Sequence, residues 1–305
     1  MALTVSAAQA AYPPEHEIWL VSTRRAPVCA PGIEASACLD FWRLGPDNQW
    51  AASDRSAFVA TASPDVPVEI FLHGNRVDRN DAVYESFKAY RHVACQAVGR
   101  PLRFVIWSWP ADEIPGRSGD DARIKAARCG TQGHYLAGLL GELDPGVRVG
   151  LVGYSFGARI AGAALHLLGG GAVDGRVLAN RPMGEHVPYR LMLVAAGMNS
   201  DSLVPGRTFG LAMTQVEAVV VTRNRNDPVL RWYPLLYRRL LAPQSLGYAG
   251  PACNTGMISV CDVTRSVGRS HSWDDYLRAS AVHGHLGWIG FADAPAVTGP
   301  AIMAP

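Results

Sequence analysis

The sequence predicts an α/β protein with a mainly parallel, doubly wound β-sheet covered by helices on both faces. Short runs rich in β-branched and aromatic residues alternate along the chain with longer segments of helical periodicity. No Ser-, Gly- or charge-rich linker divides the 305 residues, of which 49% are hydrophobic. A chain of this length and composition can bury a large core, so we expect a single domain.

Eight runs are expected to be strands, because they are too short for helices and are bounded by turn residues. They are 17–22, 56–60, 66–72, 102–107, 147–152, 191–195, 216–221 and 257–263.

Four segments with helical periodicity lie between or after these strands. They are 80–98, 122–143, 158–168 and 273–283. We expect Asn80 and Asp81 to cap the first helix, which stops before the turn residues 99–101. The third helix is expected to end in the glycines at 169–171.

The charge balance argues against polyanionic partners. With 28 basic and 26 acidic residues, the chain gives no electrostatic reason to expect nucleic acid or an anionic membrane surface. The arginines between Arg223 and Arg239 are typical of solvated surface. No apolar stretch is long enough for a transmembrane segment. Residues 1–11 lack a basic n-region, so we expect no signal peptide and favour a cytoplasmic location.

The six cysteines show no CxxC pair of the metal-binding kind. The pairs Cys29/Cys38 and Cys253/Cys261 are close enough in sequence to form local disulfides in an oxidising compartment. The interpretation we favour is that the cysteines are reduced and partly buried.

Residues 153–157, with the sequence Gly-Tyr-Ser-Phe-Gly, join an expected strand to an expected helix. Glycines two places before and after Ser155 allow a sharp turn that holds the serine in a strained backbone with its hydroxyl exposed. The sequence therefore predicts Ser155 as a nucleophile. The alternative is an ordinary serine at a helix N-terminus.

A nucleophilic serine needs a base to accept its proton and a third group to orient that base. Asp227 follows the expected strand 216–221, and His271 follows the expected strand 257–263. Active sites of parallel sheets collect at the carboxyl ends of strands, so both residues are well placed. We therefore predict a catalytic triad of Ser155, Asp227 and His271.

Other residues compete for these roles. His283, and less directly His285, also lie in the C-terminal region and are alternative bases. Asp201 ends the preceding strand and is an alternative acid. Asp274 and Asp275 are better interpreted as first-turn residues of the last helix, where negative charge favours the helix dipole.

The chain resembles the α/β-hydrolase superfamily from about Val66 to Phe291. The matching pieces are Phe71–Asn75, Gly153–Gly157, Asn226–Val229 and Ser270–Ser272, in the order Ser-Asp-His that this superfamily uses. The sequence is most similar to a poorly characterised branch in which the strand before the elbow strand ends in Trp-Pro, here Trp109-Pro110. The resemblance implies an α/β-hydrolase sheet and hydrolysis of an ester, amide or thioester through an acyl-serine.

The resemblance also divides the single domain, residues 1–305. Its parts are N-terminal strands and an extension (1–65), a catalytic core (66–291), a candidate lid insertion within that core (231–256) and a tail (292–305).

The negative oxygen of a tetrahedral intermediate needs preorganised donors, usually backbone N–H groups. One is expected from Phe156, which follows the nucleophile, and the resemblance implies Asn75 for the other. We expect His73 to hold the Asn75 loop by hydrogen bonds rather than to carry protons. The alternative for His73-Gly74 is a simple turn at the end of a strand.

Two further groups of residues surround the expected site. Residues 230–241 are apolar and aromatic with interleaved arginines. They are either a lid or pocket wall, or an amphipathic helix packed on the body and broken at Pro234, and both can hold together. Trp107 and Trp109 are expected in the core or at the floor of the pocket.

The expected function is that of a serine hydrolase (an esterase) acting on a small-molecule carboxylic ester. No HExxH motif, Rossmann fingerprint or P-loop occurs in the sequence, so we expect no cofactor and no metal. A thioesterase or peptidase would use the same triad. A non-catalytic binding protein on the same fold is the alternative from another class.

Overall fold

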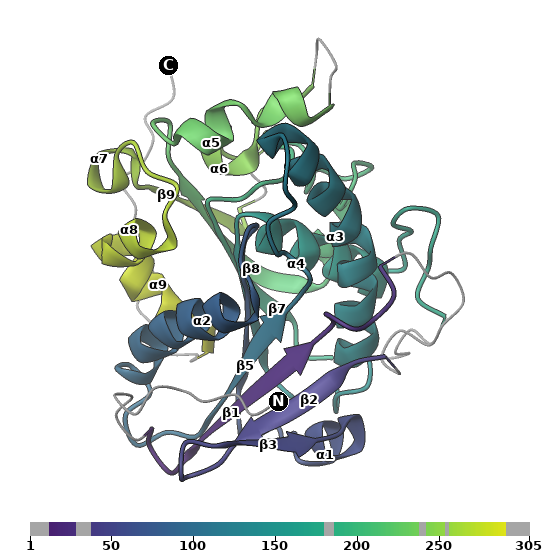
Figure 1. Ribbon diagram of the computed structural model, residues 1–305, viewed down its shortest axis with the longest axis vertical. Helices are drawn as coiled ribbons and strands as arrows, with labels where there is room; N and C mark the ends of the chain where they lie inside the picture. The colour runs from purple at the N-terminus through teal and green to yellow at the C-terminus, as the bar shows by residue number, and fades with distance from the viewer. Residues whose placement is uncertain (1–11, 29–37, 180–185, 238–241, 254–255, 291–305) are drawn as a thin grey trace.

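The computed structural model describes residues 12–28, 38–179, 186–237, 242–253 and 256–290, and these form an α/β fold around one mixed sheet (Figure 1). The nine strands of the described residues are β1 (His16–Ser22), β2 (Asp40–Leu44), β3 (Trp50–Ser53), β4 (Val68–Leu72), β5 (Leu102–Ser108), β6 (Val149–Tyr154), β7 (Tyr189–Val194), β8 (Val216–Arg223) and β9 (Ile258–Asp262).

The sheet is mostly parallel, as predicted. Its strand order is β3-β2-β1-β5-β4-β6-β7-β8-β9. All pairs from β1 to β9 along this order are parallel, whereas β2 pairs antiparallel with both β1 and β3.

Helices cover both faces of the sheet (Figure 1). Two separate apolar cores lie beneath them. One face carries α2 (Arg79–Ala94), α8 (Trp273–Arg278) and α9 (Ser280–Gly290). The other carries α3 (Ser118–Leu140), α4 (Phe156–Leu168) and the 3₁₀ helix η1 (Gly210–Thr214). Alternate side chains of β4 serve the two cores: Ile70 and Leu72 pack on the α3–α4 side, and Phe71 packs on the α2–α9 side.

The short helices are α1 (Arg55–Ala60), α5 (Pro228–Arg231), η2 (Tyr233–Tyr237), α6 (Leu246–Ala249) and α7 (Thr264–Val267). The strand predicted over 56–60 is wrong, because this segment is α1. The Asp54 side chain accepts a 2.8 Å hydrogen bond from the Ala57 N–H and so caps the helix, and Phe58 is buried. A short apolar run does not distinguish a strand from one buried helical turn.

Two predicted helix boundaries also differ from the structure. Asp78, rather than Asn80 and Asp81, caps α2 by accepting hydrogen bonds from the N–H groups of both residues. The last predicted helix is two helices, α8 and α9, separated by Ala279 in an extended conformation (φ −70°, ψ 117°).

The strand order has a topological switch point between β4 and β6. The chain leaves β4 through α2 to reach β5 on one side, and it leaves β6 through α4 toward β7 on the other. The helices α2 and α4 thus lie on opposite faces of the sheet, and the two strands they follow are neighbours that end together, where Leu72 pairs with Gly153. Ligands of open α/β sheets bind at such a point.

The described residues include no helix that is both long and apolar enough to cross a membrane. The described cysteines, Cys38, Cys95, Cys129, Cys253 and Cys261, are free, so the pair Cys253/Cys261 is not a disulfide. Cys29, the partner suggested for Cys38, lies outside the described residues.

Glu69 in β4 is fully buried, and neither of its carboxyl oxygens has a hydrogen-bond partner among the described residues. Burial raises the pKa of Glu69 well above its ordinary value of 4.5. Since the folded-state pKa exceeds the unfolded-state pKa, the folded protein binds more protons, and its stability falls as pH rises above about 4.5.

We therefore expect Glu69→Met to raise the free energy of unfolding by about 1–3 kcal/mol, because it removes an unsatisfied buried polar group. The gain should be larger at pH 8 than at pH 5, as measured by denaturant unfolding at both pH values. Glu69→Gln, which keeps the polarity but cannot ionise, is the control. A gain of equal size at the two pH values would argue against a titrating carboxyl.

Candidate active site

Ser155 lies at the turn from β6 to α4, in a conformation that residues other than glycine seldom adopt (φ 53°, ψ −114°). The backbone on both sides of the serine is held by β7 and the loop after it. The Ser155 N–H donates to the Val194 carbonyl at 2.9 Å, and the Ser155 carbonyl accepts from the Gly197 N–H at 3.0 Å. These contacts fix the strained turn.

The two glycines of the motif are required by packing. A Cβ on Gly153 would lie 2.5 Å from the Cα of Ala158 in the first turn of α4. A Cβ on Gly157 would lie 2.0 Å from the carbonyl oxygen of Leu72 at the end of β4. Any side chain at either position would push the helix away from the sheet, so the serine turn depends on both.

The structure brings together the three residues that the sequence singled out. The Ser155 Oγ lies 3.0 Å from His271 Nε2, and His271 Nδ1 lies 2.7 Å from Asp227 Oδ2. An ionised carboxylate only accepts hydrogen bonds, so Nδ1 carries the hydrogen and Nε2 is left to accept the Ser155 proton. Asp227 is fully buried, whereas the His271 side chain is 17% exposed.

Both carboxyl oxygens of Asp227 are saturated with donors. Oδ1 caps α5 by accepting from the N–H groups of Val229 (2.9 Å) and Leu230 (3.0 Å). Oδ2 accepts from the Tyr276 hydroxyl at 2.9 Å as well as from His271. Burial, together with the nearby Asp227 charge, raises the pKa of Tyr276, so its hydroxyl stays protonated and donates.

Tyr276 was not identified from the sequence. The only sequence feature that points to Tyr276 is its position five residues after His271, in the helix that follows the histidine loop. A second tyrosine, Tyr154, donates from its hydroxyl to the His271 carbonyl. Two tyrosines, one at the end of β6 and one in α8, therefore contact the histidine backbone and the carboxylate.

The competing residues lie elsewhere. Asp201 is 3.6 Å from Arg207, and the His283 ring contacts His92 on α2. His285 Nδ1 contacts the Ala281 carbonyl within α9. None of these side chains has a described contact with the Ser155 hydroxyl.

The two acidic residues after His271 are surface groups in the first turn of α8. Asp274 pairs with Lys88 at 2.6 Å, and Asp275 pairs with Arg278 at 2.5 Å.

The loop after β4 lies against the serine. A Cβ on Gly74 would lie 3.2 Å from the Ser155 Cβ and 3.0 Å from the Tyr154 ring, so a side chain here would press on both neighbours. The backbone N–H groups of Asn75 and Phe156 donate no hydrogen bond to any described residue. Both predicted oxyanion donors are thus available to a bound anion.

His73 connects the loops that follow β4 and β5. Its Nδ1 lies 2.9 Å from the Gly74 carbonyl, and its Nε2 accepts from the Trp109 N–H at 3.2 Å. The Trp109 indole stacks on the imidazole and donates to the His73 carbonyl at 3.0 Å. Burial, and to a lesser extent the Arg24 charge, lowers the pKa of His73 to about 3. The ring is therefore neutral and has the structural role expected of it.

Trp107 and Trp109 are both fully buried in the core on the α3–α4 side. Of the two placements expected for them, the structure supports the core rather than an open pocket floor.

The segment after Asp227 differs from the predicted single helix broken at Pro234. The helix α5 ends at Arg231, and Pro234 is the second residue of η2. Tyr233 is buried, whereas Trp232 and Leu235 are 61% and 64% exposed, so the segment packs one side on the body and leaves the other in solvent. Residues 238–241 of the candidate lid lie outside the described residues.

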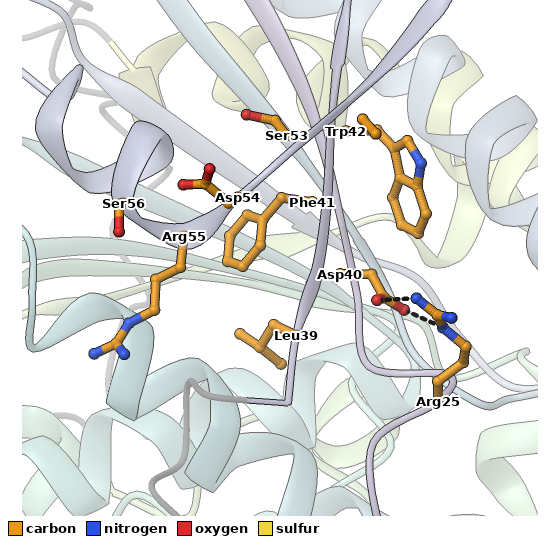
Figure 2. A pocket seen from close by; sticks show the side chains of 10 residues that line it. Arg25, Leu39, Asp40, Phe41, Trp42, Ser53, Asp54, Arg55 and Ser56 are labelled. Carbon is orange, nitrogen blue, oxygen red and sulfur yellow. Dashed lines mark hydrogen bonds and ion pairs between the residues drawn. The ribbon is translucent and has the colours of Figure 1, made fainter.

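A cavity of about 450 Å³ lies near the β3 edge of the sheet, between β2, β3 and α1 (Figure 2). Arg25 lies at the edge of the cavity and donates to Asp40 at 2.7 Å, so these two charged side chains are paired with each other. The cavity is separated from β6 by three strands and has no connection with Ser155. Among the described residues, no group of three or more His, Cys, Asp or Glu side chains is arranged to hold a metal ion.

Comparison of the chain with protein-family models gives no match, and comparison with curated proteins gives none either. The mostly parallel mixed sheet and its helices are compatible with an α/β-hydrolase-like fold.

Proposed function

We propose that this protein is a serine hydrolase that cleaves a carboxylic ester through an acyl-enzyme, on an α/β-hydrolase fold. The observation that carries this proposal is the hydrogen-bonded series Ser155–His271–Asp227, with contacts of 3.0 Å and 2.7 Å, at the carboxyl ends of parallel strands. The strained backbone of Ser155 adds support, because strain of this kind is concentrated at functional positions.

In the acylation half, the Ser155 oxygen attacks the ester carbonyl carbon while His271 Nε2 accepts the hydroxyl proton. The carbon–oxygen bond to the alcohol then breaks, and His271 returns the proton to the leaving alcohol. In the second half a water molecule attacks the acyl-serine by the same proton transfers, which releases the acid and regenerates the hydroxyl. Asp227 stays ionised and stabilises the imidazolium that forms in each half.

The carbonyl oxygen of the substrate becomes negative during both attacks. We assign its stabilisation to the backbone N–H groups of Phe156 and Asn75, which have no other partner among the described residues. We infer that the segment that contains the exposed Trp232 and Leu235 is the candidate lid.

The test is covalent labelling of the purified protein with a fluorophosphonate probe. We expect one probe per chain, on the peptide that contains Ser155, when the labelled protein is digested and analysed by mass spectrometry. Protein unfolded in denaturant is the control and should not react, because an isolated serine is a poor nucleophile. A folded protein that takes up no probe, or takes it up on another serine, would refute the proposal.

Turnover of p-nitrophenyl esters with increasing acyl length would then define the substrate. A rate that peaks at one length would give the size of the acyl site.

A further inference from the structure

A buried ion pair lies on α3 beside the loop that follows β4. Asp121 and Lys125 are one helical turn apart, and their side chains are 1% and 0% exposed. Lys125 Nζ donates to Asp121 Oδ1 at 2.9 Å. Removing two charges from water costs free energy that their mutual attraction barely offsets, so a pair of this kind is weak evidence for stability.

Two of the five other hydrogen bonds that the side chains of this pair make are to Asn75. The Asn75 amide nitrogen donates to Asp121 Oδ2 at 3.1 Å, and the Asn75 amide oxygen accepts from Lys125 Nζ at 3.5 Å. Both ends of this side chain are therefore held by α3. The side chain is thus occupied by the helix, whereas the Asn75 backbone N–H donates no hydrogen bond to any described residue.

The same pair also holds residues of the loops that follow β4 and β5. Asp121 also accepts from Arg76 Nε at 3.2 Å and from the Ile114 N–H at 3.2 Å, and Lys125 donates to the Asp112 carbonyl. Arg76 has a positive φ of 56°, a conformation that needs such support. Burial alone would raise the pKa of Asp121, but hydrogen bonds from Lys125 and Arg76 lower it. The carboxyl is thus ionised and accepts from several donors at once.

We propose that Asp121 and Lys125 are positioning residues for the oxyanion hole: by holding the Asn75 side chain, they aim the Asn75 backbone N–H at the substrate oxygen. This inference depends on the proposed function. Donors stabilise a developing negative charge only if they are aimed before the reaction, so loosening the loop weakens transition-state binding and leaves ground-state binding intact.

Two variants test the proposal. Asn75→Ala removes the held side chain but keeps the backbone N–H. The double variant Asp121→Leu/Lys125→Met removes the pair without leaving an uncompensated buried charge, which a single substitution would do. For both we expect kcat on a p-nitrophenyl ester to fall about 10- to 100-fold while KM changes less than about twofold, since losing one oxyanion donor outright costs about 10²–10³.

The discriminating readout is the inhibition constant of a trifluoromethyl ketone, which forms a tetrahedral adduct with a serine and places a negative oxygen in the same hole. In both variants this inhibition constant should rise by the same factor by which kcat/KM falls. Arg103→Met is the matched control. Arg103 is also a buried charge, 1% exposed and paired with Glu17 at 2.7 Å. It lies near the start of β5, whereas the loop that contacts Asp121 and Lys125 follows the end of this strand. It should lower the melting temperature without changing kcat or the inhibition constant.

Three outcomes would refute the positioning role, and the last of them would refute the proposed function as well. If the wild type hydrolyses the ester but Asn75→Ala keeps the wild-type kcat and inhibition constant, the positioning role is refuted and the proposed function stands. If Arg103→Met changes both constants as much as the double variant does, the effect is general destabilisation and the positioning role is again refuted. If the wild type neither hydrolyses esters nor reacts with fluorophosphonate, the proposed function fails and the positioning role fails with it.

Discussion

Replacing Ser155 with alanine is expected to reduce kcat/KM for ester hydrolysis by about 10⁶-fold, the effect that removal of a triad serine has elsewhere. The Ser155 Oγ is the group that His271 Nε2 reaches, at 3.0 Å, and the described residues offer the histidine no second hydroxyl. Alanine keeps the Cβ, so the packing against Gly74 stays the same. The measurement is steady-state hydrolysis of a p-nitrophenyl ester by wild type and variant at matched concentrations.

Ser86→Ala is the control for this variant. Ser86 is a fully buried serine on α2 whose hydroxyl donates to the Ala82 carbonyl at 2.6 Å and has no described contact with Ser155, His271 or Asp227. It should cost some stability and leave the turnover rate unchanged. If Ser155→Ala retained more than about a thousandth of the wild-type rate, another group would have to be the nucleophile.

The Asp227→Asn variant is expected to reduce kcat by about 10⁴-fold with little change in KM. The amide is neutral, so it cannot stabilise the imidazolium, and its NH₂ group facing His271 Nδ1 would favour the wrong tautomer. Asparagine remains a good helix cap, so the hydrogen bonds from Val229 and Leu230 to this side chain can be kept. The loss should therefore appear in kcat far more than in the melting temperature.

Asp262→Asn provides the comparison, because Asp262 ends the neighbouring strand β9 and pairs with Arg223 on the surface at 2.6 Å. It should leave kcat within about twofold of the wild type, since exposed ion pairs contribute little. Equal losses in Asp227→Asn and Asp262→Asn would mean that Asp227 has no special relation to His271.

The central strands could be predicted from the sequence because their apolar runs are long enough to be buried on both faces. The outer hairpin could not. Strands β2 and β3 are short and half-exposed, and the segment 40–53 has no dense apolar run. The apolar run at 56–60 was misassigned as a strand because the cap at Asp54 was not recognised.

The candidate triad could be predicted because each member follows a different parallel strand, and such strands end at the same edge. The residues that support the triad could not be predicted in this way. Tyr276 reaches Asp227 from a helix, and Asp121 and Lys125 reach Asn75 from another. Sequence spacing shows that Asp121 and Lys125 face the same side of α3, but it does not show which loop lies against that side.

Among the described residues, strand β9 pairs only with β8, and the chain that follows β9 carries His271. Structure at a sheet margin opens locally at lower free energy than the interior does. The half of the proposed reaction centre that carries protons is thus attached to an edge of the sheet, while the attacking oxygen is attached to its middle. Gentle heating would accordingly abolish the proposed activity while the helices and inner strands remain folded.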